Sequence, residues 1–153
     1  MQTFLPYPNI KKSLECLDYR RLGKQRVEAY QIFNVLANPQ AKKGWKNHPI
    51  VKMWRGYEQA LTHYTNCAIE EWINRGYNNN MKFIGIIGEK FELPPWFGNE
   101  KFHASHRANL LRKDPDFYGQ FNWKENPSLL YVWRDEDRKW YEQERGSKKR
   151  NYF

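Results

Sequence analysis

Apolar residues recur at helical spacing in three stretches of the chain, and each stretch has its own end signals. In the first, Ser13 can cap a helix that runs to about Leu36, and the Asn38-Pro39 pair ends it. Its apolar face consists of Leu22, Ala29, Ile32, Phe33 and Leu36. Gly23 costs such a helix about 1 kcal/mol relative to alanine, so we expect another backbone or a ligand to approach it closely.

The second stretch has the longest apolar stripe. Asn47-His48-Pro49 can open a helix, because proline suits the first helical turn and a short polar side chain before it can cap. The stripe consists of Ile50, Trp54, Tyr57, Leu61, Tyr64, Ala68 and Trp72. It keeps a period near 3.6 residues and stops at Gly76, which predicts one continuous core helix.

The third predicted helix spans Asn99–Lys113, and Asp114-Pro115 ends it. Residues 81–91 fit either a short helix or a strand. Before the first helix, Pro6 and Pro8 predict an extended arm over residues 1–12, with Phe4 and Leu5 against the core.

The remainder of the chain is less regular in its pattern. We expect the apolar residues 129–133 to pack back on the core, and residues 134–153 to be helical in part at most. From about residue 142 the basic tail is predicted to be mobile. The pattern as a whole predicts an all-α fold: a compact bundle of three to four main helices, with an extended N-terminal arm and long loops. No linker is visible, so residues 1–153 are expected to form a single domain.

Charge and aromatic content suggest the partner. The chain has 26 Lys and Arg against 17 Asp and Glu, a net charge of +9, and 17% aromatic residues. An excess of cations interleaved with aromatic rings favours a polyanionic partner, with nucleic acid as the leading candidate. Most of the rings are nevertheless expected only to pack in the core.

The cysteines and the lack of a signal peptide or membrane-spanning segment in the pattern indicate the cellular location. Cys16 and Cys67 lie within helical patterns and not in a CxxC motif, which favours buried thiols of a reducing cytoplasm. The N-terminal MQTFLPYPNIKK is too polar for a signal peptide, and no apolar run approaches membrane-spanning length. We therefore expect a cytoplasmic protein, monomeric and without a membrane partner.

The segment DYRRLGKQRVE, residues 18–28, carries the first candidate site. On a helix, Arg21, Lys24, Gln25 and Glu28 share one face at three- and four-residue spacing. Long donors around a single acid suit an anionic ligand with one acid or base beside it. The alternative is a solvated helix face held by a Lys24–Glu28 ion pair.

The third helix carries a second set of candidates on its polar face, namely His103, His106, Arg107 and Lys113. The two histidines could bind a metal, contact phosphate or act as a general acid, or could simply lie on a wet basic face. If both helices border one groove, it would be lined by Arg20, Arg21, Lys24, Arg107, Arg112 and Lys113. The segment DFYGQFNW, with Tyr118, would then supply a surface for stacking on bases.

Several motifs are similar to those of a known family. They are YRRL in the first helix, GWKNHP and NRGY at the two ends of the second, and HASHR with LLRKDPDFYGQF in the third. They resemble small bacterial and phage proteins that are grouped with the pyrimidine-dimer DNA glycosylases of the bacteriophage endonuclease V type. The resemblance extends over most of residues 1–123, and it is closer to a mostly uncharacterised branch than to the enzymes that have been studied.

The resemblance implies an all-α domain that grips bent duplex DNA, flips a nucleotide and cleaves its N-glycosidic bond. In the studied enzymes the N-terminal amine attacks the sugar C1′, a glutamate assists, and β-elimination through a Schiff base cuts the strand. Tyr19 and Arg20 match the residues before that glutamate, but Arg21 stands in its place. Asp18 and Glu28 are the nearest carboxylates on the same helix, and we favour Glu28 because it shares a face with Lys24.

The nucleophile is a second departure from the family pattern. Gln2 is too large for ordinary removal of Met1, so the amine of Met1, the amine of Lys24 or a water molecule remains a candidate. No cofactor and no resident metal are expected. Asn47 and His48, from the matching GWKNHP motif, join the candidate DNA-binding residues.

Three functions therefore stay open. The first is a DNA glycosylase, with or without AP-lyase activity, that acts on a damaged or modified base, more readily a pyrimidine. The second is a nucleic-acid-binding protein that keeps the scaffold without the chemistry. The third is a glycosidase that acts on RNA or on a phage-modified base.

Overall fold

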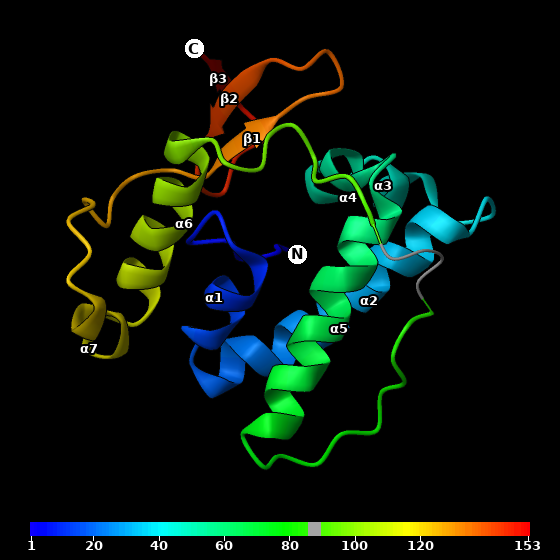
Figure 1. Cartoon of the computed structure of the whole chain (residues 1–153). Helices are drawn as coiled ribbons and strands as arrows, with labels where there is room; N and C mark the ends of the chain where they lie inside the picture. Colours follow the sequence, from blue (N-terminus) through cyan, green and yellow to red (C-terminus); the bar gives the residue numbers. More distant parts are fainter. Residues whose placement is uncertain (86–89) are drawn as a thin grey trace.

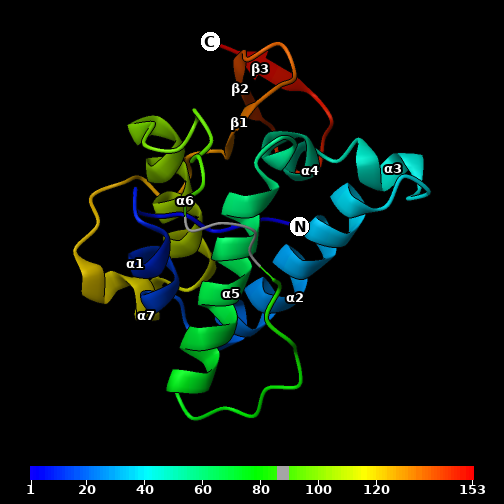
Figure 2. The same ribbon diagram turned by 45° about the vertical axis from the view of Figure 1, so that its right-hand side comes forward.

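The computed structural model describes residues 1–85 and 90–153 (Figure 1). The helices are α1 (Ile10–Glu15), α2 (Tyr19–Ala37), α3 (Lys43–Lys46), α4 (Pro49–Trp54), α5 (Glu58–Asn74), α6 (Glu100–Lys113), α7 (Pro115–Tyr118) and the 3-10 turn η1 (Gly119–Phe121). The strands are β1 (Val132–Arg134), β2 (Trp140–Gln143) and β3 (Arg150–Tyr152). Figures 1 and 2 show α2 and α5 side by side, α6 and α7 on the other side of the N-terminal segment, and the strands at one end.

The N-terminal arm runs through the middle of the molecule, with Gln2 to Pro6 buried. Side chains from the surrounding helices take the place of neighbouring strands as hydrogen-bond partners for its backbone. From α2, Gln25 Oε1 accepts from the Phe4 N–H at 2.8 Å, and Gln25 Nε2 donates to the Gln2 carbonyl at 3.0 Å. The burial of Phe4 and Leu5 in the core confirms that part of the prediction for the arm.

The arm is shorter than predicted, and the first predicted helix is two helices. Asn9 caps α1, which therefore begins inside the predicted arm, and Asp18 caps α2. Ser13 does not cap: its hydroxyl accepts from the Tyr7 N–H and donates to the Tyr7 carbonyl, both at 3.0 Å. The apolar spacing continues across Cys16 and Leu17, so the periodicity alone did not show the break.

The single long helix predicted from Pro49 to Gly76 is also wrong. It is broken into α4 and α5 at Gly56, whose φ of +89° is a left-handed conformation that L side chains rarely adopt. His48, rather than the shorter Asn47, caps α4, because its Nδ1 accepts from the Ile50 N–H at 3.2 Å. The stripe residues still reach the core, since Trp54, Leu61 and Tyr64 are all fully buried.

The third predicted helix is confirmed, because Asn99 caps α6 and its side chain accepts from the Phe102 N–H at 3.0 Å. Asp114 then ends α6 and caps α7. Residues 81–85 and 90–91 form neither helix nor strand, and the remainder of the ambiguous stretch, residues 86–89, lies outside the described part of the chain.

The C-terminal region corrects the all-α prediction to a mostly α fold. Strands β1, β2 and β3 form an antiparallel sheet in sequence order, with Trp133 opposite Tyr141 and Tyr141 opposite Tyr152. Val132, Trp133 and Tyr141 are buried and Tyr131 packs against the core, which confirms the predicted packing for residues 131–133, whereas Leu129 is exposed. The short strands lie among many charged residues, so a strand pattern was hard to see there. Mobility of the tail and the single-domain organisation stay predictions.

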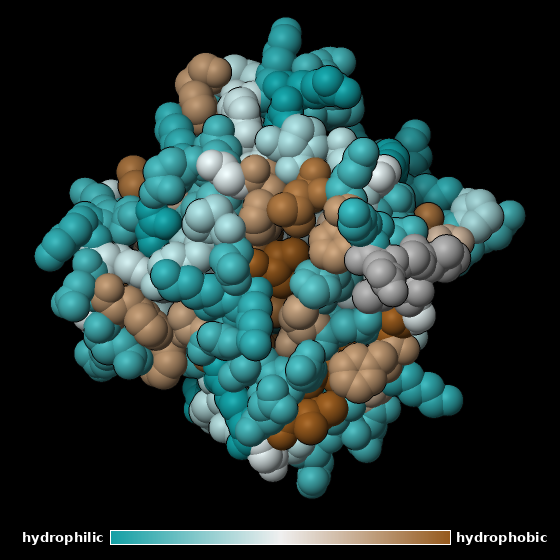
Figure 3. Space-filling model, viewed as in Figure 1, coloured by the Kyte–Doolittle hydropathy of each residue, from teal (hydrophilic) through white to brown (hydrophobic). Residues whose placement is uncertain are grey.

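One face of the molecule is predominantly polar. On the face shown in Figure 3, hydrophilic residues cover most of the area and apolar residues show between them in small patches. Within residues 1–85 and 90–153, none of the helices is both long enough and apolar enough to cross a membrane.

Candidate active site

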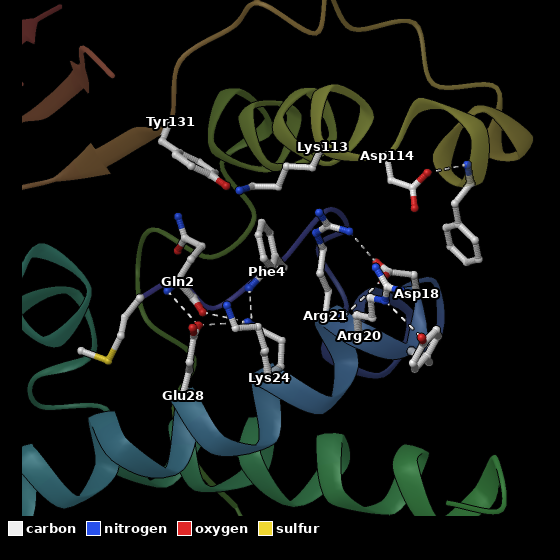
Figure 4. A pocket seen from close by; sticks show the side chains of 14 residues that line it. Gln2, Phe4, Asp18, Arg20, Arg21, Lys24, Glu28, Lys113, Asp114 and Tyr131 are labelled. Atoms are coloured by element: carbon white, nitrogen blue, oxygen red, sulfur yellow. Dashed lines mark hydrogen bonds and ion pairs between the residues drawn. The ribbon is translucent and has the colours of Figure 1, made fainter. Parts of the chain in front are cut away.

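A cavity of about 670 Å³ lies where the N-terminal arm, α2 and the end of α6 meet (Figure 4). Its volume is within the range of cavities that hold small ligands. Polar side chains from α2 and α6 face each other across it, and aromatic rings complete the wall. The lining residues are Met1, Gln2, Phe4, Asp18, Tyr19, Arg20, Arg21, Lys24, Gln25, Glu28, Lys113, Asp114, Phe117 and Tyr131.

Glu28 is held at the arm side of this cavity. Its Oε2 accepts from the Gln2 backbone N–H at 3.3 Å and from Gln25 Nε2 at 3.4 Å (Figure 4). The carboxylate therefore lies one residue away from the α-amine of Met1. Glu28 is partly exposed and forms no ion pair with Lys24. The structure therefore does not have the solvated helix face held by a Lys24–Glu28 ion pair that was the alternative interpretation of this segment.

Asp18 lines the same cavity but is occupied by structural contacts. Its Oδ1 accepts from Arg21 at 3.1 Å and from the Tyr118 hydroxyl, and its Oδ2 caps α2 through the Arg21 N–H. Burial raises the pKa of the Asp18 carboxyl, but hydrogen bonds from Tyr118 and Arg21 outweigh burial and leave the pKa lowered. A carboxylate that is ionised and fully engaged is a poor general base.

The cations at the cavity come from two helices. Lys24 and Arg20 of α2 are exposed, Arg21 is half-buried in its pair with Asp18, and Lys113 lies on the opposite wall, at the end of α6 (Figure 4). Burial lowers the pKa of the Lys113 amine, and the charges of Arg112, Arg21 and Lys24 lower it further. Of the six cations predicted to line a groove between the first and third helices, these four line the cavity.

Other candidates of the third helix turn inward, so their predicted exposure on a polar face is wrong. His103 Nδ1 donates to the Leu5 carbonyl at 2.7 Å, and His106 Nδ1 accepts from the Leu5 N–H at 2.8 Å. Both rings are fully buried. Their three-residue spacing serves to grip both backbone groups of one arm residue, and this accounts for the pair without a metal or a phosphate.

Arg107 is also taken up inside the molecule. Its Nη1 donates to the Pro6 carbonyl at 2.7 Å, its Nε donates to Glu125 at 2.6 Å, and it pairs with Glu100. With two carboxylates around it and 9% of its surface exposed, it cannot neutralise a DNA phosphate in this conformation. Gln25 was also predicted to contact a ligand. It is buried, and its side-chain amide is hydrogen-bonded to the backbone of the N-terminal arm.

The predicted stacking surface in DFYGQFNW packs on itself. Tyr118 is fully buried and stacks on Trp123, with centroids 5.7 Å apart and 13° between the planes, and Phe121 stacks on Trp123 at 5.1 Å. Arg112 and Asn47 are exposed but do not line the cavity.

A second cavity of about 510 Å³ adjoins the first and shares Met1 and Tyr131 with it. His48 lies here, beside the C-terminal residues 143–148. Burial lowers the pKa of the His48 imidazole, and the positive charge of the N-terminal amine lowers it further. The first residue of the chain is thus placed between Glu28 on one side and His48 on the other.

Sequence reasoning missed five of the lining residues, namely Gln2, Phe4, Asp114, Phe117 and Tyr131. Tyr131 comes from the segment before β1, far from the arm in sequence, and burial raises the pKa of its phenol to about 12. Nothing in its sequence neighbourhood marks it as a site residue. Phe4 and Phe117 were placed in the core and in the stacking cluster, and only the fold shows that they also face the cavity.

Comparison with protein families places the chain in a known family. Residues 1–85, more than half of the chain, match the family model described as pyrimidine dimer DNA glycosylase. The chain belongs to the pyrimidine dimer DNA glycosylase family. Membership implies a DNA glycosylase, an enzyme of DNA repair with DNA as its substrate. No curated protein and no solved structure matches the chain.

The matched region of the pyrimidine dimer DNA glycosylase family contains the arm and α1 to α5. It therefore includes Met1, Lys24 and Glu28, whereas Lys113 and Tyr131 on the opposite wall lie outside it. The family resemblance of the sequence is confirmed. Which residues carry the chemistry is a separate question, and the geometry above is the basis for answering it.

Proposed function

We propose that this protein is a DNA N-glycosylase that takes a nucleotide with a damaged or modified base, most readily a pyrimidine, out of duplex DNA into the first cavity. Family membership supports the reaction class. The observation that carries the site assignment is the hydrogen bond from the Gln2 N–H to Glu28, which sets a carboxylate beside the N-terminal residue.

The groups around the cavity match the needs of this reaction. Arg20, Lys24 and Lys113 are cations that can neutralise phosphates next to the extruded nucleotide. Phe4 and Tyr131 offer aromatic surface for the base. As the glycosidic bond breaks, positive charge develops on the sugar, and the Glu28 carboxylate stabilises it.

In this proposal the α-amine of Met1 is the nucleophile. Its nitrogen forms a bond to C1′ while the C1′–base bond breaks, and the base leaves with the electron pair and takes up a proton. That nitrogen then loses a proton to the Glu28 carboxylate, which is hydrogen-bonded to the neighbouring Gln2 N–H. As the nitrogen lone pair forms the C=N bond, the bond from C1′ to the ring oxygen breaks, and the ring oxygen takes up that proton. The resulting protonated imine permits the β-elimination that can cut the strand.

The test is reductive trapping on a duplex that contains a cyclobutane pyrimidine dimer. Borohydride reduces the imine to a stable amine, so a covalent protein–DNA adduct is expected, and peptide mapping should place it on Met1. An added N-terminal tag should suppress the adduct, whereas Lys24→Ala should keep it. An adduct that survives the tag and maps to Lys24 or Lys113 would contradict the choice of Met1. Base release without any adduct would make the enzyme monofunctional, with water as nucleophile and Glu28 as the group that orients it.

One observation favours a non-catalytic alternative. Arg21 occupies the place where the resemblance expects the catalytic glutamate, and it is paired with Asp18. A DNA-binding protein on the same scaffold would bind the lesion and release no base. The test is base release from a panel of substrates: duplexes with different damaged bases, duplexes with phage-modified bases, and RNA. The non-catalytic protein would release no base from any of them, and a glycosidase for RNA or modified bases would release a base only from those substrates.

We also propose that the enzyme works as a monomer in the cytoplasm. Cys16 and Cys67 are free thiols. Burial raises the pKa of the Cys16 thiol to about 12 and that of Cys67 to about 11, so both are protonated and unreactive at neutral pH. Such thiols suit a reducing compartment.

A further inference from the structure

Three aromatic rings form a row beside the mouth of the first cavity, and the site described above does not use two of them. The row starts at Tyr19, the first residue of α2 and a lining residue of the cavity. Tyr77 follows, with its centroid 6.2 Å from that of Tyr19, and Trp72 of α5 lies 4.4 Å from Tyr77. The planes of successive rings differ by 34° and 31°. We call these three residues the tyrosine row.

The end of α5 fixes the row in place. Gly76 adopts a φ of +87°, and the N–H groups of Gly76 and Tyr77 donate to the carbonyls of Ile73 and Trp72 at 2.9 and 3.3 Å. This pair of hydrogen bonds is a Schellman motif, which turns the chain back so that the residue after the glycine packs on the last helical turn. Trp72 Nε1 also donates to the Asn78 carbonyl at 2.8 Å. The Tyr77 ring is therefore held before any ligand arrives.

Trp72 itself is locked between its neighbours. The Arg26 guanidinium lies 4.3 Å from the ring centroid, and a Cβ added at Gly23 would come within 3.0 Å of the same ring. A close approach to Gly23 is present as expected, but it comes from the Trp72 side chain and not from another backbone or a ligand. A rigid tryptophan behind Tyr77 gives the row a firm backing.

The outer rings remain open to solvent although they are large and apolar. Tyr19 is 50% exposed and Tyr77 is 41% exposed. The Schellman motif explains why Tyr77 contacts Trp72, but it does not explain why a second exposed ring from α2 continues the row. Two adjacent exposed aromatic side chains at the edge of a cavity mark a place where flat surfaces can be covered.

The charges beside the row favour a nucleic acid as the occupant. Arg20 donates from Nε to the Tyr19 hydroxyl at 3.1 Å, and Arg26 donates to the Asn79 side chain at 2.7 Å. Both acceptors are neutral, so these hydrogen bonds leave the positive charge of the two guanidinium groups uncompensated, and Arg20 is exposed at the edge of the cavity. Aromatic faces flanked by cations are the combination that binds unpaired nucleotides.

We propose that the tyrosine row is a stacking platform for the unpaired base next to the nucleotide that enters the cavity. This proposal rests on the DNA glycosylase function proposed above. Inside a duplex both faces of every base are covered by neighbours. When one nucleotide leaves the stack, the face of the adjacent base is exposed, and covering it offsets part of the cost of unstacking. Tyr77 and Tyr19 are placed to cover that face at the cavity edge.

The experiment compares binding to two duplexes, one continuous and one interrupted by a tetrahydrofuran abasic analogue that leaves a base face open. The wild-type protein should prefer the interrupted duplex. Tyr77→Leu keeps an apolar contact with Trp72 and removes the flat ring, so the preference should fall by about tenfold, in line with the stacking of one base. Tyr77→Phe should keep the preference. Trp45→Leu is the matched control, because Trp45 is 45% exposed but lies on α3, near the other end of α2.

A fluorescent base gives a second readout that does not depend on affinity. With 2-aminopurine next to the abasic analogue, binding of the wild type, Tyr77→Phe or Trp45→Leu should quench the fluorescence through stacking, and binding of Tyr77→Leu should not. A preference and a quench that persist in Tyr77→Leu would overturn the proposal. Equal weakening on both duplexes would also overturn it, because the row would then contact the duplex without recognising an open base face.

The two proposals fail separately in this design. Neither duplex contains a damaged base that the enzyme could release, so the binding results do not depend on catalysis. If the wild type releases no base from any damaged duplex and still shows the Tyr77-dependent preference, the glycosylase assignment is wrong and the platform stands. If base release occurs and the preference does not depend on Tyr77, the platform is wrong and the glycosylase assignment stands.

Discussion

Glu28 and Asp18 lie on one helix and line one cavity, yet their surroundings suit them to different tasks. Asp18 is buried and its oxygens hold Arg21, Tyr118 and the start of α2. Glu28 is partly exposed, and within residues 1–85 and 90–153 its Oε2 accepts two long hydrogen bonds, at 3.3 and 3.4 Å, while its Oε1 has no partner. These contacts leave the Glu28 carboxylate available for the role proposed above, whereas Asp18 keeps the helix in place.

Substitution of the two acids should separate these tasks. Glu28→Gln keeps an oxygen for the Gln2 N–H, so folding and DNA binding should be close to those of the wild type while base release is lost. Asp18→Asn keeps an acceptor for the helix cap and should retain base release, whereas Asp18→Ala should lower the free energy of unfolding by about 1 to 2 kcal/mol. The measurements are base release from a dimer-containing oligonucleotide and denaturant unfolding. Loss of base release in Asp18→Asn alone would reverse the assignment.

At the scale of elements, α6 and α2 act as clamps on the N-terminal arm. The arm forms no sheet, and side chains bind its backbone groups between Gln2 and Pro6: Gln25 and Glu28 of α2, His103, His106 and Arg107 of α6, and Tyr64 of α5. Burial lowers the pKa of His106 well below the usual value for histidine, and the charges of His103 and Arg107 lower it further. Burial also lowers the pKa of His103. The clamp on Leu5 therefore works with neutral imidazoles.

Acid should loosen this clamp. In the unfolded chain the histidines take up protons below about pH 6.5, whereas in the folded chain their lowered pKa values keep them neutral. Protons are thus bound preferentially by the unfolded state, and the free energy of unfolding should fall as the pH drops below about 6.5, by at most about 1.4 kcal/mol per pH unit for each histidine. Urea unfolding between about pH 7.5 and pH 5 checks this. His106→Asn, which keeps an acceptor and cannot titrate, should show a shallower fall, and an unchanged fall would contradict the argument.

The contact between α2 and α5 gives a second prediction at this scale. Gly23→Ala should gain about 1 kcal/mol of helix propensity, but the new methyl group meets the Trp72 ring at 3.0 Å, and that ring is held by Arg26 and Tyr77. Overpacking of this kind costs about 1 to 3 kcal/mol, so the net effect should be neutral or destabilising. Gly119→Ala is the control, because nothing lies within 4 Å of its added Cβ and its φ of −60° suits alanine. Equal gains in melting temperature for both variants would show that the Trp72 ring can move aside.

At the scale of the whole molecule, the net charge of +9 is divided between cations used inside and cations left for a partner. Arg107 and Arg75 form ion pairs with carboxylates of the chain itself. Arg20, Lys24 and Lys113 surround the candidate site instead. Cations that are paired with the chain's own carboxylates are less available to DNA phosphates, so the total charge overstates the number of contacts.

Salt titration should count those contacts. Between about 50 and 200 mM salt, duplex affinity should fall by on the order of a thousandfold, because each neutralised phosphate releases a counterion. Lys113→Gln should reduce the slope of log K against log salt by about 0.9. Lys11→Gln should leave it unchanged, because Lys11 lies on α1, outside the cavity, opposite Glu15 at 4.0 Å. A flat salt response of the wild type would remove the nucleic-acid assignment.

The sequence by itself determined the features that depend on neighbours along the chain. The cap at Asn99, the stop at Asp114-Pro115 and the apolar stripe of α5 are local signals, since helix ends and faces are set within a few residues. The grouping of Arg21, Lys24 and Glu28 on one face was correct for the same reason, and all three line the cavity. The breaks at Cys16-Leu17 and Gly56 were missed because the apolar spacing continues through them.

Only the tertiary structure decided which polar residues face a partner and which hold the fold. A histidine or arginine on a helix has the same local signature whether it points to solvent or to another segment. Leu5 is about a hundred residues away from His103 and His106, and no periodicity records that contact. The backbone groups of the arm form no sheet and must be satisfied once the arm is buried. This requirement accounts for the inward position of His103, His106 and Arg107, whereas Lys113 of the same helix lines the cavity opposite Glu28.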